Sequence, residues 1–437
     1  MDWVGSLSGA VVIMLGLFFI GLPVFLTFLV INIIGVFMLM GTSGFGMFAN
    51  SIYQSVTQTS LAAVPLFIIM GEILFRSGTI DILIDSVDKL VGSVKGRGYY
   101  LITVLSTLFG ALCGSPVAVA ALLGRTVMPG MTGRGYNVRF TAGAILGGAT
   151  LAAIIPPSLL VVVLGSLVDV SKPGLLIAGI VPGMLLAGLM AGFIFLSMRI
   201  HPELEPVAAG TNLQEVTGRG QLMAVIRIVP FSLVIFFVMG WIMLGVATPS
   251  ESAATGVVGA VIVAPIYRKL SLKMLMESVL STVAITAMLM AILLSSQLFD
   301  QLLAFTGATS GLMKAVSGLS LSSGAMFLLL MAGPFFLCMF IDLFAIMLVA
   351  IPIYLPLIKI YGYEPTWFWM LFVINLVLGS MTPPFGYTLF SLKGAAPAVS
   401  LEDIYVGAWP MMFVFLVGMA IMFFFPSLVS FLPGVFN

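Results

Sequence analysis

The sequence of 437 residues is poor in charge and in the residue types that most often perform chemistry. Only 8% of the residues are charged, the formal net charge is +1, and there is one histidine. A typical soluble domain carries about 25% charged residues, so this chain has too few to cover a surface in water. The net charge near zero gives no reason to expect a nucleic-acid partner.

The few potentially reactive residues are poorly placed for catalysis or tight metal binding. His201 lies in a polar stretch, while Cys113 and Cys338 lie in apolar ones, where we interpret them as buried apolar residues. We find no nucleophile–base pair at workable spacing and no Walker motif, G-x-x-x-x-G-K-S/T. We expect neither an enzyme nor an ATPase. The N-terminal stretch also lacks the basic region of a signal peptide, since the first basic residue is Arg76.

Apolar residues are abundant instead. They make up 61% of the chain, and the mean hydropathy is +1.24. A helix needs about 20 apolar residues to cross a bilayer, and many stretches approach or exceed that length. We therefore predict an all-α polytopic membrane protein with lipid as its solvent.

The apolar stretches form two similar series. From residue 1 to residue 198 they are scaffold spans within 9–76, a hairpin at 100–129, a broken helix at 138–168 and a span at 174–198. From residue 227 to residue 437 they are scaffold spans within 227–298, a hairpin at 324–357, a broken helix at 366–394 and a span at 406–430. The polar stretch 199–226 between the two series is interpreted as a cytoplasmic linker.

Each hairpin is predicted to be re-entrant because its two halves are too short to span a bilayer. Each series then crosses the membrane an odd number of times, which gives an inverted structural repeat. Basic residues flank the first hairpin more densely than the second, so the first is expected to open to the cytoplasm. On this topology both termini lie on the outer side of the membrane. The basic residues are Lys89, Lys95, Arg97, Arg134 and Arg139 around the first hairpin, and Lys314 and Lys359 around the second.

Residues that interrupt helices recur at a constant spacing of 227 positions. The first set is Pro129, Gly135, Tyr136, Leu151, Pro156 and Pro157, and the second is Pro356, Gly362, Tyr363, Leu378, Pro383 and Pro384. Apolar segments interrupted by Pro or Gly at matching positions of two halves are the best sequence indication of a transporter's binding site.

Further motifs follow one another in order along nearly the whole chain. In the first half they are residues 114–118 (GSPVA), 128–131 (MPGM), 135–136 (GY), 154–158 (IIPPS), 170–171 (VS) and 179–183 (GIVPG). In the second half they are Asp342, Pro352, Pro356, Gly362 and residues 379–386 (GSMTPPFG). This ordered set resembles the large membrane subunit (M) of TRAP, or tripartite ATP-independent periplasmic, transporters, which belong to the ion transporter superfamily.

The resemblance implies an elevator-type transporter in the bacterial inner membrane. It implies uptake driven by a sodium gradient, with no organic cofactor. Two partners are implied as well: a periplasmic substrate-binding protein (P) and a small four-helix membrane subunit (Q). A stand-alone sodium/organic-anion symporter of the same superfamily is the alternative.

The helix breaks at Pro156, Pro157, Pro383 and Pro384 free backbone carbonyls, which can bind sodium. We expect two pseudo-symmetric sodium sites and no other metal. The first candidate site contains Gly114, Ser115, Val117, Gly148, Thr150 and Ala153. The second contains Phe340, Asp342, Asn375, Gly379 and Thr382. The plainer explanation, that these small residues only allow close helix packing, stays open.

The candidate substrate contacts are polar residues near the same breaks. They are Ser115, Arg125, Ser158, Asp342, Thr388 and Lys393. Because arginine binds carboxylates and sulfonates with two parallel hydrogen bonds, Arg125 is a possible substrate anchor. Together with the resemblance it suggests a small organic anion, a carboxylate or sulfonate, as substrate. Arg125 could instead reach the interface or pair with Glu72.

Three further positions leave alternatives open. Asp342 corresponds to Ser115 in the repeat, and it could ligate sodium, orient the second hairpin tip or be a satisfied buried carboxylate. Lys393 could meet the anion or mark the inner interface. Val119 stands where the related family often has Asp, and Arg125 where many relatives have small residues, so the substrate class stays open.

Overall fold

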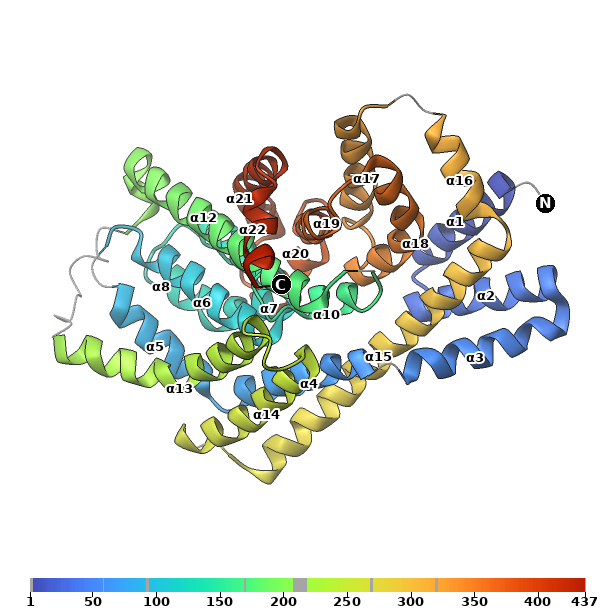
Figure 1. The fold of residues 1–437 in the computed structure, drawn as a ribbon. Helices are drawn as coiled ribbons and strands as arrows, with labels where there is room; N and C mark the ends of the chain where they lie inside the picture. Colours follow the sequence, from blue (N-terminus) through green and yellow to red (C-terminus); the bar gives the residue numbers. More distant parts are fainter. Residues whose placement is uncertain are drawn as a thin grey trace.

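The structure is a computed structural model that describes residues 3–57, 59–91, 94–168, 170–206, 218–267, 270–318 and 321–436. Within these ranges all regular structure is helical (Figure 1). Six of the described helices, counting α11 and α12 as one, are long and apolar enough to cross a membrane. The predicted all-α membrane fold is confirmed.

The helices of the first half follow the predicted order, with two additions. They are α1 (Trp3–Phe19), α2 (Val24–Met40), α3 (Phe45–Val56), α4 (Ala63–Arg76), α5 (Thr79–Val91), α6 (Arg97–Cys113), α7 (Pro116–Thr126), α8 (Met128–Gly133), α9 (Val138–Leu151), α10 (Leu159–Gly165), α11 (Lys172–Ala178) and α12 (Ile180–Ile200). The additions are α3, and α5 in the charged stretch before the hairpin.

The second half repeats this order. Its helices are α13 (Gly218–Met243), α14 (Pro249–Ile266), α15 (Leu272–Phe305), α16 (Ala308–Ser317), α17 (Ser323–Leu337), α18 (Leu343–Tyr361), α19 (Pro365–Ser380), α20 (Tyr387–Ala395), α21 (Leu401–Phe424) and α22 (Ser427–Phe436). The structure thus has two hairpins, α6–α7 and α17–α18, and two broken helices, α9–α10 and α19–α20.

Three boundaries differ from the sequence prediction. Helix α13 begins at Gly218, inside the predicted linker 199–226, and the apolar residues 222–226 (LMAVI) continue directly into the predicted span. The predicted span 174–198 is divided at Gly179, where a Cβ atom would meet the Ile154 carbonyl. The predicted last span, 406–430, contains the end of α21 and the start of α22.

The helices form two bodies. Scaffold helices α2, α4, α13, α14 and α15 pack on one another and line the lower side of the view in Figure 1. The hairpins, the broken helices, α12 and α21 form the second body, which we call the hairpin body. Helices of the two halves interlock in both bodies, since α4 packs on α14 and α7 packs on α20.

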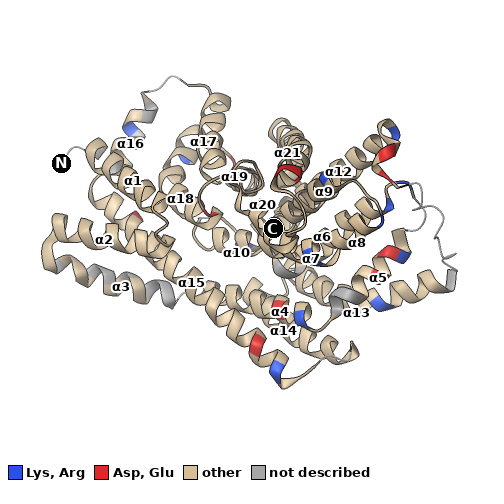
Figure 2. Cartoon of the chain, turned by 180° about the vertical axis from the view of Figure 1, so that it is seen from behind, with Lys and Arg blue, Asp and Glu red and all other residues tan. Residues whose placement is uncertain are grey.

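Charge is sparse on this fold and densest in a few places. Figure 2 shows long uncharged ribbons, with Lys, Arg, Asp and Glu gathered near α5, at the end of α12 and at the start of α15. One acidic residue outside these places begins a helix: the Glu251 carboxylate accepts the Thr248 N–H at 2.8 Å. Thr248 and Glu251 form a capping box at the start of α14.

Candidate functional site

The first hairpin turns at Gly114, where α6 ends in a left-handed conformation with φ +54°. A Cβ atom there would lie 2.6 Å from the Leu159 amide nitrogen, so only glycine allows the tip to rest on the start of α10. Ser115 then caps α7, its Oγ accepting the Ala118 N–H at 3.4 Å. The first tip therefore presents the positive N-terminal end of α7.

The first broken helix bends at the cis peptide bond between Pro156 and Pro157. Ser158 closes the bend, because its Oγ donates to the Ala153 carbonyl at 2.5 Å and accepts the Val161 N–H at 3.3 Å. The Thr150 hydroxyl donates to the Leu146 carbonyl at 3.0 Å. Both the serine and the threonine side chain are buried.

The second hairpin turns between α17 and α18, and Asp342 caps α18. Its Oδ1 accepts the Phe344 N–H at 2.9 Å. The neighbouring Phe340 ring packs on Phe385, with 5.3 Å between centroids. An acidic cap thus offsets the positive end of α18, whereas the serine cap leaves the positive end of α7 in place.

The second broken helix bends at the cis bond between Pro383 and Pro384. The Thr382 hydroxyl donates to the Leu378 carbonyl at 2.7 Å, and the Asn375 amide donates to Met331 of α17 at 2.8 Å. At Gly379 a Cβ atom would lie 2.5 Å from the Phe335 carbonyl. The second hairpin therefore packs tightly on the second break, as the first does on its own.

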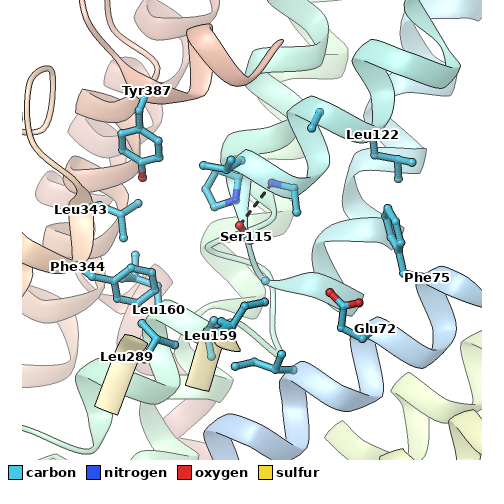
Figure 3. Close-up of a pocket in the computed structure, with 18 of the residues that line it drawn as sticks. Glu72, Phe75, Ser115, Leu122, Leu159, Leu160, Leu289, Leu343, Phe344 and Tyr387 are labelled. Carbon is cyan, nitrogen blue, oxygen red and sulfur yellow. Dashed lines mark hydrogen bonds between the residues drawn. The ribbon is translucent and has the colours of Figure 1, made fainter. Parts of the chain in front are cut away.

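Both tips line one cavity of about 560 Å³ between the hairpin body and the scaffold (Figure 3). In the close-up, Leu343 and Phe344 of the second hairpin stand on one side, and Ser115 and Leu122 of the first stand opposite. Pockets for small molecules have volumes of about 300–1,000 Å³ and mostly apolar walls with a few polar groups. The cavity has both properties.

Five of the predicted residues line this cavity: Gly114, Ser115, Val117, Arg125 and Asp342. The remaining ones lie outside its lining. These are Gly148, Thr150, Ala153, Ser158, Phe340, Asn375, Gly379, Thr382, Thr388 and Lys393. Most belong to the helix breaks directly behind the tips.

Two predicted substrate contacts are engaged elsewhere in the structure. The Lys393 ammonium donates to the carbonyls of Pro397 at 2.9 Å and Val399 at 2.7 Å. The Thr388 hydroxyl is buried and lies 3.1 Å from Ser380 Oγ. Both side chains therefore support the chain after the second break rather than face the cavity.

The predicted pairing of Arg125 with Glu72 is not made. Glu72 also lines the cavity, but its carboxylate binds Arg76 at 2.8 Å. Arg76 additionally binds Glu277 at 3.1 Å. Among the described residues, no carboxylate lies within ion-pair distance of Arg125, and no basic side chain lies within that distance of Asp342.

Several cavity residues were missed by sequence reasoning. Leu160 and Tyr387 lie 227 positions apart, just after the two breaks, so the repeat itself could have identified them. Figure 3 shows the Tyr387 hydroxyl pointing into the cavity. The scaffold wall, with Glu72 and Phe75 of α4 and Leu289 of α15, had no comparable signal because its apolar residues resemble those of ordinary spans.

The polar groups behind the tips are suited to a hard cation such as sodium, which prefers oxygen ligands. Near the first break, the Ser106 hydroxyl is buried against Gly148 and has no hydrogen-bond partner among the described residues. Near the second, the hydroxyl oxygen of Thr382 and the Oδ1 of Asn375 keep acceptor capacity, since only their donor groups are used above.

Paired hairpins and broken helices around a shared cavity are the architecture of a multi-pass membrane transporter. The model of the family described as "Tripartite ATP-independent periplasmic transporter, DctM component" matches residues 11–428, and the chain belongs to this family. Its members are named as transporter permeases, not enzymes.

Similar proteins share most of the chain's length. The ectoine TRAP transporter large permease protein TeaC of Halomonas elongata is 29% identical over 96% of this chain and 97% of its own. The C4-dicarboxylate permease DctM of Pseudomonas aeruginosa is 28% identical over 88% and 89%. The sialic acid permease SiaM of Vibrio cholerae is 25% identical over 99% of both chains.

The fold is also similar to that of a solved structure, the YdaH transporter of Alcanivorax borkumensis. The TM-score is 0.57 at 14% sequence identity, covering 90% of this chain and 91% of that one. At this identity the likeness concerns the fold alone.

Proposed function

We propose that this chain is the permease that carries a small organic anion, a carboxylate or sulfonate, across the inner membrane. A sodium gradient drives the uptake, and the hairpin body moves against the scaffold as an elevator. The observation that supports this best is the cavity, which is lined by both hairpin tips and by α4 and α15 of the scaffold. A substrate bound there would touch both bodies.

Sodium would be held directly behind the two tips. The first site would use oxygens around Gly114, Ser115, Val117, Gly148, Thr150 and Ala153, with Ser106 as an additional candidate. The second would use oxygens around Phe340, Asp342, Asn375, Gly379 and Thr382. Sodium bound at these sites would fix each tip against its break, and so would link ion binding to the shape of the cavity.

The anionic group of the substrate would face the first hairpin. Arg125 lines the cavity on α7, and the N-terminal end of the same helix is positive. The relatives named above transport ectoine, C4-dicarboxylates and sialic acid according to their names, and each of these compounds carries a carboxylate. Arg125 is our candidate for its anchor.

The permease would work with a periplasmic substrate-binding protein and a small four-helix membrane subunit, and both of its termini would lie in the periplasm. The test is uptake into proteoliposomes that hold the chain and the small subunit, with the binding protein outside. We expect uptake only with an inward sodium gradient and with the binding protein. Sodium-driven uptake without the binding protein would favour the stand-alone symporter, and uptake without sodium would overturn the ion sites.

A further inference from the structure

The cavity carries two charges of opposite sign that have no oppositely charged partner among the described residues. Arg125 and Asp342 both line it, and no ion pair involves either side chain among the described residues. The third charged residue of the lining, Glu72, is already bound to Arg76. The unpartnered charges are therefore one guanidinium and one carboxylate.

These two charges belong to opposite walls. Arg125 lies in the last turn of α7 of the first hairpin, and the positive N-terminal end of the same helix begins at Ser115. Asp342 lies at the second tip, next to Leu343 and Phe344, which Figure 3 shows across the cavity from Ser115. The electrostatic field thus runs across the cavity, from a positive first hairpin to a negative second hairpin.

Between the charged groups the walls are apolar. Phe75, Leu122, Leu159, Leu289 and Phe344 all line the space. In such surroundings a charge is costly to desolvate unless an opposite charge meets it. An anion alone would pair with Arg125 and would also be repelled by Asp342.

We propose that the substrate of this permease is a compact zwitterion that bridges the two hairpins. Its carboxylate or sulfonate faces Arg125, its cationic group faces Asp342, and its apolar body contacts the walls between them. This inference rests on the proposed transport function and specifies the substrate class of the same site.

A bridging zwitterion would also link the two hairpin tips through the substrate. The first and second hairpins come from different halves of the chain, and each contributes one charge. Only a ligand with both charges pairs both side chains at once, whereas a simple anion offers the Asp342 carboxylate no opposite charge. Selection between the two ligand types then follows from the protein's charge pattern.

The experiment measures binding to the purified complex of this chain with the small subunit, without the binding protein, so that only the permease selects. Calorimetric titrations in sodium buffer compare two zwitterions, ectoine and glycine betaine, with the anions isethionate and succinate. We expect at least one zwitterion to bind about tenfold or more tightly than either anion.

The decisive variant is Asp342→Asn, which keeps a side chain able to cap α18 and removes the charge. We expect zwitterion affinity to fall about tenfold or more and isethionate affinity to rise. Arg125→Gln should weaken both classes of ligand. Glu277→Gln is the matched control. Glu277 lies on α15, binds Arg76 and is not part of the cavity lining, so its loss should change neither zwitterion affinity nor anion affinity.

The other outcomes each overturn the proposal. If either anion binds more tightly than both zwitterions, the substrate class is wrong. If Asp342→Asn weakens zwitterions and anions equally and reduces sodium dependence, the carboxylate serves sodium instead. In both cases sodium-driven uptake in proteoliposomes still supports the proposed function, and loss of that uptake for every compound would refute the function itself.

Discussion

The two hairpin tips occupy equivalent places in the repeat but carry different chemistry. Ser115 and Asp342 lie 227 positions apart, and each caps the returning helix of its hairpin. The serine is neutral and leaves the positive end of α7 available, whereas the aspartate offsets that of α18. Equivalent caps in the two hairpins thus carry different charges, which gives one cavity two unlike walls.

The hairpins also differ in how their helices are interrupted. Neither α6 nor α7 has a proline in its interior, but α17 contains Pro334 and α18 contains Pro352 and Pro356. A proline leaves the carbonyl four residues earlier without its helical partner. Leu330 and Leu348 are such carbonyls, and the hydroxyls of Tyr354 at 2.6 Å and Ser296 at 3.1 Å bond to them. In the second hairpin, side-chain hydroxyls therefore bond two carbonyls that prolines leave free. In the first hairpin no interior proline leaves such a carbonyl.

The largest expected effect comes from Gly114→Ala, because it removes the feature that is unique to the first tip. Alanine is strained at φ +54°, and its Cβ would lie 2.6 Å from the Leu159 amide nitrogen. We expect a loss of about 2–4 kcal/mol in stability and near-complete loss of uptake. Thermal unfolding and proteoliposome uptake measure the two effects.

Gly133→Ala is the matched control, because Gly133 lies in α8 and a Cβ there would meet nothing within 4 Å. Its stability should stay within about 0.5 kcal/mol of the original chain. If Gly114→Ala behaved like this control, close contact between the first tip and the first break would be unimportant for transport.

The next largest effect is expected from Ser115→Asp, which makes the two tips alike. Aspartate still caps a helix, but it places a second negative charge beside the cavity. Two negative charges, such as this aspartate and the substrate's carboxylate, repel each other by about 2 kcal/mol at a separation of about 8 Å and an effective dielectric of 20. We expect the KM for an anionic or zwitterionic substrate to rise at least about tenfold.

Ser115→Asn separates charge from shape in this test. Asparagine also caps helices and is neutral, so uptake should stay within about threefold of the original. Equal losses for Asp and Asn would mean that the size of the side chain, rather than the charge difference between the tips, determines binding.

Much of this architecture could be predicted because helix breaks leave a visible signature. The pairs Pro156–Pro157 and Pro383–Pro384, and the motif around Gly114, locate both broken helices and the first tip from sequence alone. Charge inside an apolar stretch is equally visible in a sequence. It singles out Arg125 and Asp342, and both of these residues line the cavity.

The rest could not be predicted because it depends on which side chains meet across the fold. Lys393 was expected at the substrate, but its partners Pro397 and Val399 lie on the loop just after its helix. Glu72 was a possible partner for Arg125, but it binds Arg76, one turn away on the same helix. Local contacts of long side chains compete with the distant ones that sequence patterns suggest.

A smaller effect is expected from Ser296→Ala, which tests the hydrogen bond between the scaffold and the second hairpin. Ser296 lies on α15 and donates to the Leu348 carbonyl that Pro352 leaves free. Removing the donor leaves a buried carbonyl unsatisfied, at a cost of about 1–3 kcal/mol. Thermal unfolding should show this loss.

Ser295→Ala supplies the control from the adjacent residue. The Ser295 hydroxyl donates to Ala291 of its own helix at 2.8 Å, so its removal should cost less than about 0.5 kcal/mol. Equal destabilisation by the two variants would show that the bond between the scaffold and the second hairpin contributes nothing specific.

The smallest effect on transport is expected from Lys393→Met, which removes the one basic residue of α20. The ammonium group holds two loop carbonyls after the second break, and no cavity residue is among its partners. Stability should fall by about 1–2 kcal/mol, while the KM for the transported substrate should change less than about twofold. A KM increase of tenfold or more would return Lys393 to the binding site. In that case the second half would contribute a positive charge of its own, and the contrast between a positive first hairpin and a negative second one would no longer hold.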